Sequence, residues 1–167
     1  TGYYFDGNSL IIEGKLYDVN SAQLIIGKRY IGTHKSMRRM VHKLADEIYF
    51  RFTGQRGIAQ SKIAFLGKYN GYKELFVIDF DGHDPIRLTA DRSLVLSPDW
   101  APDGKNIIYT TYRNGKPELY SVDPSTGNQQ AVITEGSLNS APAFSPDGRQ
   151  LAFSGSTDGN PEIYLFD

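Results

Sequence analysis

The chain has 167 residues, of which 40% are hydrophobic and 13% aromatic, which is enough to bury a globular core. It contains no cysteine, which excludes disulfides and thiolate metal sites, and no apolar run reaches the roughly 18 residues of a membrane-spanning helix. The net charge of −1 gives no general attraction to nucleic acid, so we expect no nucleic-acid partner.

The charge is unevenly divided along the chain. Residues 1–60 carry nine Lys and Arg against five Asp and Glu, a net +4. Residues 61–167 carry nine against fourteen, a net −5. This difference indicates two units of different character.

The first part predicts two strands followed by an amphipathic helix. Leu10–Val19 and Gln23–Tyr30 are rich in β-branched and aromatic residues and are separated by a polar turn. From Ser36 onward, apolar side chains recur every three or four residues, as one face of a helix requires. These apolar residues are Met37, Met40, Val41, Leu44, Ile48 and Phe52. Thr33 or Ser36 can cap the start of this helix, and Gly54 can cap its end.

The second part repeats itself at a spacing of 44 residues. Trp100–Gly104 recurs as Phe144–Gly148, and Lys116–Tyr120 recurs as Asn160–Tyr164. An earlier copy begins near Glu74–Phe76, and Asp79, Asp123 and Asp167 are each 44 residues apart. Self-similarity at a period of about 40–50 residues, with short alternating strands, is typical of propeller blades. A single blade cannot bury its own apolar face, so function usually lies on a surface that several blades build together.

Each copy resolves into short strands. The middle copy predicts strands over Leu96–Ala101, Asn106–Tyr112, Pro117–Val122 and Gln129–Ile133. The copy before it predicts Ile63–Leu66, Glu74–Ile78 and Pro85–Leu88, and the copy after it predicts Ala141–Ser145, Gln150–Phe153 and Glu162–Phe166. One complete four-stranded blade is therefore flanked by two incomplete ones. Such an array cannot close alone, and unpaired blade edges favour association. We expect either that further blades complete it or that copies of the chain associate, since two copies would supply six blade equivalents.

The blade pattern resembles that of a known family. Ser97–Lys105, with Ala141–Gly148 one period later, is similar to the blades of the TolB family, periplasmic propeller proteins of the bacterial Tol–Pal envelope system. Leu16–Val19, Met37–Tyr49 and Phe52–Ala59 resemble the end of that family's N-terminal α/β domain. The helix and the segment after it are the more specific match, since several propeller families share the Pro-Asp-Gly turn.

The resemblance implies a mainly β fold, in which a partial propeller of two to three four-stranded blades of a six-bladed type follows an α/β segment. Residues 1–57 would be the end of the α/β domain and residues 58–167 the first blades, with repeats at 58–95, 96–139 and 140–167. Because the sequence begins with Thr1 and not with methionine, we expect a processed or excised segment. The resemblance to a family with about six blades implies that this segment comes from the middle of a longer protein. The family implies a non-enzymatic periplasmic interaction scaffold that needs no cofactor or metal and serves envelope integrity, cell division and protein transport.

The family also implies partners and a binding surface. Its propeller binds the peptidoglycan-associated lipoprotein Pal at one mouth, and TolA binds an N-terminal peptide that we expect to lie outside this sequence. The Pal-binding surface includes the loop that enters the innermost strand of a blade. The residues that match this position are Leu138, Asn139, Ser140 and Ala141, with Ser97 and Pro98 as neighbours one blade earlier. The alternative is a plain turn that positions Pro142 and Phe144 in the core.

Other chemistry has less support. Asp103 and Asp147 occupy equivalent turns of neighbouring blades, which favours a turn-forming role over a catalytic pair. Asp79–Asp84 resembles a calcium loop only in part, so a hairpin turn is the better interpretation. Two alternatives stay open: the propeller of a prolyl-oligopeptidase-like serine peptidase, although no Gly-x-Ser-x-Gly motif is present, and a propeller with a ligand or metal in its central channel.

Overall fold

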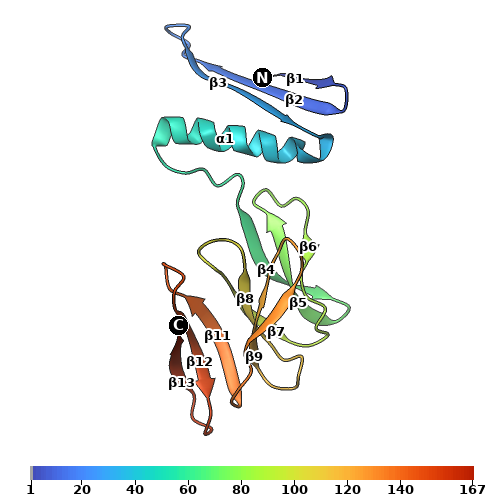
Figure 1. Cartoon of the computed structure of the whole chain (residues 1–167), viewed down its shortest axis with the longest axis vertical. Coiled ribbons are helices and arrows are strands. Elements are labelled where there is room, and N and C mark those ends of the chain that lie inside the picture. The colour runs from blue at the N-terminus through green and yellow to red at the C-terminus, as the bar shows by residue number, and fades with distance from the viewer. Residues whose placement is uncertain (1) are drawn as a thin grey trace. The chain divides into compact units, whose positions relative to one another are not determined.

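A computed structural model describes residues 2–167. Contacts divide them into two compact units, residues 2–61 and Lys62–Asp167 (Figure 1). Segment 58–61, which the sequence placed with the blades, belongs to the first unit by its contacts. The reason is local: the Asp46 carboxylate on the helix accepts hydrogen bonds from the backbone N–H groups of Ala59 and Gln60.

The first unit is a three-stranded antiparallel sheet with one α-helix. Its elements are β1 (Gly2–Asp6), β2 (Ser9–Tyr17), β3 (Leu24–Gly32), the 3₁₀ turn η1 (His34–Ser36) and α1 (Met37–Thr53), and the sheet order is β1-β2-β3. The two predicted strands and the helix are confirmed. Strand β1 was missed, although the two-residue turn Gly7–Asn8 that joins it to β2 is a typical hairpin signal.

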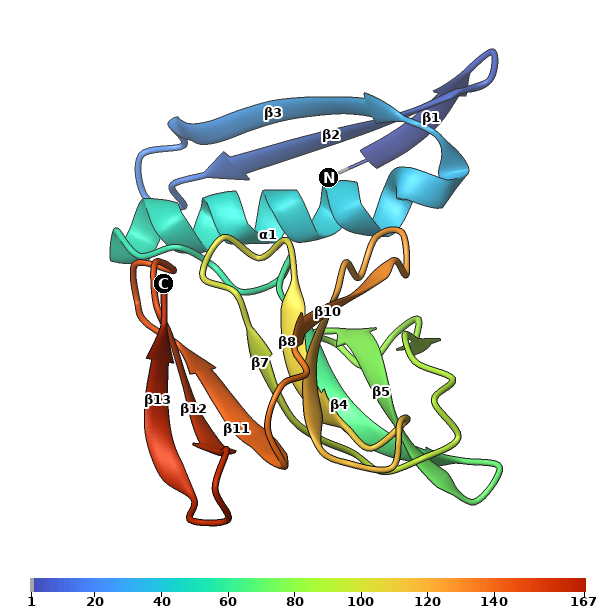
Figure 2. The ribbon, with the colours of Figure 1, turned by 60° about the horizontal axis from the view of Figure 1, so that its bottom comes forward.

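Helix α1 lies along one face of this sheet (Figure 2). The buried side chains between them are Leu10 and Ile12 from β2 and Met40 and Leu44 from α1. The helix follows Ser36 and ends at Gly54 in the left-handed conformation, as predicted. The predicted apolar face is too wide, because only part of it meets the sheet: Met40 and Leu44 are buried, and Met37 packs against the same core. Val41 is 46% exposed and Phe52 is 65% exposed.

The second unit consists of three antiparallel sheets in chain order (Figures 1 and 2). The first contains β4 (Lys62–Tyr69), β5 (Tyr72–Asp79) and β6 (Ile86–Arg87). The second contains β7 (Val95–Trp100), β8 (Ile107–Thr111), β9 (Glu118–Val122) and β10 (Gln129–Ile133), and the third contains β11 (Leu138–Phe144), β12 (Leu151–Ser156) and β13 (Glu162–Phe166). The predicted partial propeller, with one four-stranded blade between two three-stranded ones, is confirmed. A shift of 44 residues aligns β4 with β8 and β8 with β12, so the first blade lacks a counterpart of β7.

Neighbouring blades bury each other's apolar faces. One core lies between the first two blades and contains Leu75, Val77, Leu88, Val95, Ile107, Tyr109 and Val122. A second core joins the middle and last blades and contains Ile108, Leu119, Leu151 and Phe153. Because side chains alternate along a strand, Ile107 and Tyr109 face one neighbour while Ile108 faces the other. Strand β8 is consequently buried on both faces.

Candidate partner-binding site at the propeller mouth

The six residues predicted to bind a partner lie in innermost strands. Ser97 and Pro98 are within β7, and residues 138–142 are within β11, whereas the sequence placed the latter in a loop ahead of the strand. In each strand the pairing shifts at a β-bulge, which is formed by Ser97 and Pro98 in β7 and by Ala141 and Pro142 in β11. Proline has no N–H to donate to the ladder, so a bulge is where these strands accommodate it.

Both bulges contain a left-handed residue that is not glycine. The φ angle is +47° at Ser97 and +51° at Ala141, two positions that are 44 residues apart. A side chain in this conformation costs about 1 kcal/mol, and such strain persists only where the surrounding structure enforces it. The bulge is therefore a repeated feature of the innermost strands and not an accident of one blade.

The exposure of these residues differs. Ser97 and Ala141 are exposed, whereas Pro98, Leu138 and Ser140 are half-buried. Asn139 is only 3% exposed. Its side-chain amide donates to the carbonyl of Glu135 at 2.6 Å, and its backbone N–H donates to the carbonyl of Pro117 at 3.1 Å. Asn139 thus fixes the backbone at the start of β11. The surface that a partner could contact comes from neighbouring residues such as Ala141.

A buried carboxylate holds the segment that leads into β7. Glu74 is 2% exposed and accepts hydrogen bonds from the Thr89 hydroxyl at 2.6 Å and from the N–H groups of Asp91 at 3.2 Å and Arg92 at 3.0 Å. Three donors compensate the burial of this charge. The carboxylate therefore fixes the backbone of residues 89–92.

The next blade also has a buried glutamate at this position, but its hydrogen-bond partner is different. Glu118, 44 residues after Glu74, is also buried and accepts from the Asn114 side-chain amide at 2.7 Å. Beside it, the Lys116 ammonium donates to the carbonyl oxygens of Thr134 at 2.7 Å and Gly136 at 2.8 Å. Lys116 thus fixes residues 134–136, the segment that leads into β11, as Glu74 fixes the segment that leads into β7.

A second network joins residues 89–94 to the middle blade. Asp91 accepts from the Thr111 hydroxyl at 2.5 Å and from Arg113 Nη2 at 2.5 Å and Nε at 3.1 Å. Arg113 Nη2 also donates to the Tyr109 hydroxyl at 2.9 Å and to the Gln129 side-chain carbonyl. Burial, reinforced by the negative charge of Asp91, raises the pKa of Tyr109. The Tyr109 hydroxyl therefore keeps its proton and stays available as a hydrogen-bonding group.

Sequence reasoning missed both networks. The only available signal was that Glu74 and Glu118 recur at the 44-residue spacing, beside the apolar residues that mark the strand. A charged residue repeated on a strand looks solvent-facing without knowledge of the loop that covers it.

The turn carboxylates behave as local caps. Asp147 Oδ1 accepts from the Ser145 hydroxyl at 2.6 Å and from the Arg149 N–H at 3.2 Å, and Asp103 Oδ1 accepts from the Lys105 N–H at 2.9 Å. In the part of the chain that the structure describes, no group of three or more His, Asp or Glu side chains has an arrangement that could hold a metal ion. Within residues 2–167, no helix combines the length and hydropathy needed to cross a bilayer.

Residues 49–167 match the protein family described as the TolB beta propeller domain. The chain belongs to this family. It is 43% identical over 107 residues to the Tol-Pal system protein TolB of Syntrophotalea carbinolica and 41% identical over 107 residues to that of Geobacter metallireducens. In both cases the match covers 64% of this chain and 25% of the relative, so the matched part spans about a quarter of the length of these TolB proteins.

The structure extends the similarity to the first unit. TolB from Acinetobacter baumannii matches with a TM-score of 0.86 and 32% identity, over 99% of this chain and 42% of that chain. The α/β segment is therefore TolB-like together with the blades. Puromycin hydrolase matches 64% of this chain and 18% of its own with a TM-score of 0.50 and 22% identity, which shows a shared fold only.

Proposed function

We propose that the chain is part of a non-enzymatic periplasmic scaffold of the Tol–Pal system and binds the peptidoglycan-associated lipoprotein at the propeller mouth. The observation that carries this proposal is the repeated strained bulge, which presents Ser97 and Ala141 at equivalent places in adjacent blades. The chain belongs to the TolB family, whose curated members are named Tol-Pal system proteins. This membership supports both the assignment to the Tol–Pal system and the periplasmic location.

The proposed mechanism is binding by a surface that is already ordered. Glu74 fixes residues 89–92, the Asp91–Arg113 pair anchors the same segment to the middle blade, and Asn139 fixes the start of β11. Because little conformational freedom remains to be lost, the cost of association falls. The small side chains of Ser97, Ser140 and Ala141 let a partner's backbone approach closely.

At the level of the whole protein, the proposal includes a role in envelope integrity and cell division. It also includes TolA as a second partner, through a segment outside this chain. The alternative of a prolyl-oligopeptidase-like peptidase has only the shared propeller fold of puromycin hydrolase in its favour.

Titration calorimetry of the chain with the purified lipoprotein tests this proposal. We expect a one-to-one complex that Ala141→Arg weakens at least about tenfold, because a bulky charge blocks the centre of a contact surface. Asn128→Arg adds the same charge at an exposed turn at the opposite end of the strands and should leave binding unchanged. Absence of a complex, or equal effects of the two substitutions, would contradict the proposal.

A further inference from the structure

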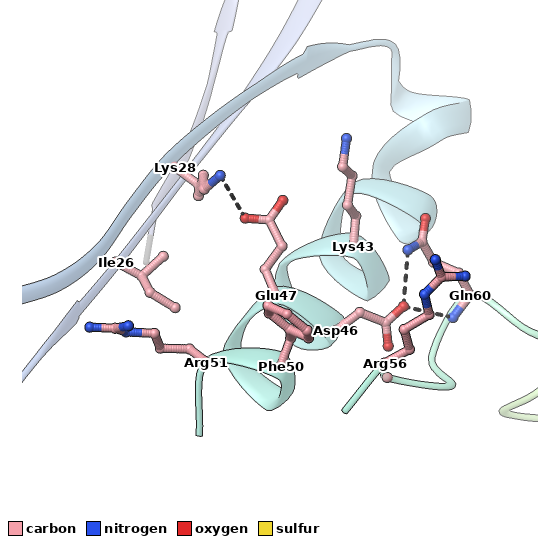
Figure 3. A pocket seen from close by; sticks show the side chains of 10 residues that line it. Ile26, Lys28, Lys43, Asp46, Glu47, Phe50, Arg51, Arg56 and Gln60 are labelled. Atoms are coloured by element: carbon pink, nitrogen blue, oxygen red, sulfur yellow. Dashed lines mark hydrogen bonds and ion pairs between the residues drawn. The ribbon is translucent and has the colours of Figure 1, made fainter. Parts of the chain in front are cut away.

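A separate pocket opens on the first unit. It has a volume of about 580 Å³ and lies between β3, helix α1 and the segment that follows the helix (Figure 3). The lining side chains that matter here are Ile26, Lys28, Asp46, Phe50, Arg51 and Arg56. The volume is that of an ordinary ligand site.

The two carboxylates at this pocket are engaged within the unit. Glu47 forms an ion pair with the Lys28 ammonium at 2.9 Å. Asp46 accepts from the N–H groups of Ala59 at 2.8 Å and Gln60 at 3.2 Å and from the Gln60 side-chain amide at 2.9 Å. The Lys28 ammonium offsets the charge of Glu47, whereas Asp46 keeps its negative charge because its donors are neutral amide groups. The four cationic side chains of the lining still outnumber these two carboxylates.

The arginines of the pocket have no such partners. Across residues 2–167, the side chains of Arg51 and Arg56 form no ion pair and no hydrogen bond with another described residue. Lys43 also lines the pocket, and its ammonium lies 5.8 Å from the centroid of the Tyr30 ring. Residues 1–60 carry the net charge of +4 noted above, so the pocket lies in the positive half of the chain.

Apolar surface lies between these charges. Phe50 is 56% exposed although it lines the pocket, and Figure 3 shows Asp46 between it and Arg56. Ile26 of β3 adds a half-buried aliphatic side chain on the Arg51 side. Aromatic residues and arginine are both enriched at protein–protein interfaces.

We propose that this pocket binds an acidic peptide segment of a partner protein. An apolar side chain of the peptide packs on Phe50 and Ile26, and its carboxylates pair with Arg51 and Arg56. The occupant follows from charge complementarity, because two guanidinium groups without ion-pair partners lie beside an apolar floor and the four cationic side chains of the lining outnumber its two carboxylates. A nucleic acid fits less well, since the chain as a whole carries a charge of −1. The site is independent of the propeller mouth.

The test uses the isotope-labelled chain and a set of short capped peptides. Each peptide carries one Phe or Leu flanked by glutamates at varied spacing, and a matched set carries glutamine instead. We expect acidic peptides to shift the amide resonances of residues 50–57, and we expect the glutamine set to have no effect. Arg51→Gln or Arg56→Gln should each weaken binding about three- to tenfold, and added salt should weaken it further.

Arg39→Gln is the matched control, because it removes one positive charge from the exposed surface of the same helix outside the pocket. It should leave peptide binding unchanged, and circular dichroism should show intact helix in all variants. The proposal would be overturned if no acidic peptide bound at a concentration of about 1 mM, because a dissociation constant above this value is too weak for specific recognition. An equal loss with Arg39→Gln, or tighter binding of a short single-stranded oligonucleotide, would overturn it as well.

Discussion

At the scale of single residues, Asp46 and Gly57 join helix α1 to the segment that leads into the blades. The Asp46 carboxylate takes three hydrogen bonds from Ala59 and Gln60. Gly57 makes this possible by its lack of a side chain. A Cβ atom at this position would lie 2.1 Å from Asp46 Oδ1 and 2.7 Å from Asp46 Cα. The run Phe52–Ala59, which is one of the TolB-like segments of the sequence, therefore has a packing explanation.

Gly57→Ala should destabilise the first unit by about 1–3 kcal/mol, because the Cβ displaces the segment from the helix. Ellipticity at the helix band reports this unit, since α1 is the one α-helix among the described residues. The fluorescence of Trp100, the single tryptophan, reports the second unit and should change little. Gly2→Ala is the control, because its Cβ meets nothing within 4 Å. Equal unfolding midpoints for both variants would contradict this explanation.

At the scale of elements, the regular strands were predictable and the bulges were not. Strands β10 and β13 match their predicted bounds because alternation and turn residues mark both ends. The bulges depend on left-handed backbone at Ser97 and Ala141, and no local propensity favours that conformation for serine or alanine. The positions of the candidate site were therefore predictable from the repeat, whereas their geometry required the three-dimensional structure.

The strained bulge predicts an unusual response to glycine. Ala141→Gly should stabilise the second unit by about 0.5–1 kcal/mol, because glycine adopts a positive φ without steric cost. Ala143→Gly, two residues further along the same strand, should destabilise it by a similar amount. Urea unfolding followed by Trp100 fluorescence measures both. Destabilisation by both substitutions would argue against strain at Ala141.

The turn after β11 predicts an acid-sensitive contribution to stability. A hydrogen bond from the Ser145 hydroxyl, aided by the Arg149 N–H, lowers the pKa of Asp147 below its ordinary value of 3.8. Because the pKa is lower in the folded state, the contribution is complete above the unfolded value and is lost as the pH falls through the folded value. The stability difference between the wild type and Asp147→Asn should therefore shrink between about pH 5 and about pH 2. A difference independent of pH would contradict this assignment.

At the scale of the whole molecule, the blades depend on their neighbours for burial. Among the strands of residues 2–167, β13 pairs with β12 alone, and its Ile163 and Leu165 are 75% and 68% exposed. An apolar strand with an open edge is a template for pairing with another chain.

We therefore expect the chain to self-associate through β13. Light scattering should give a mass that rises with concentration above the monomer value of 18.7 kDa. Replacing Ile163 and Leu165 with lysine should restore the monomer, since charges on an edge strand oppose pairing. A concentration-independent monomer mass for the unmodified chain would rule out this association.

Hydrogen exchange with and without the lipoprotein shows whether the innermost strands and the segments leading into them form the lipoprotein-binding surface. We predict added protection in residues 89–98 and 134–142 and no change in helix α1. Protection confined to the first unit, or no change in either stretch under conditions where the complex forms, would contradict this placement of the binding surface.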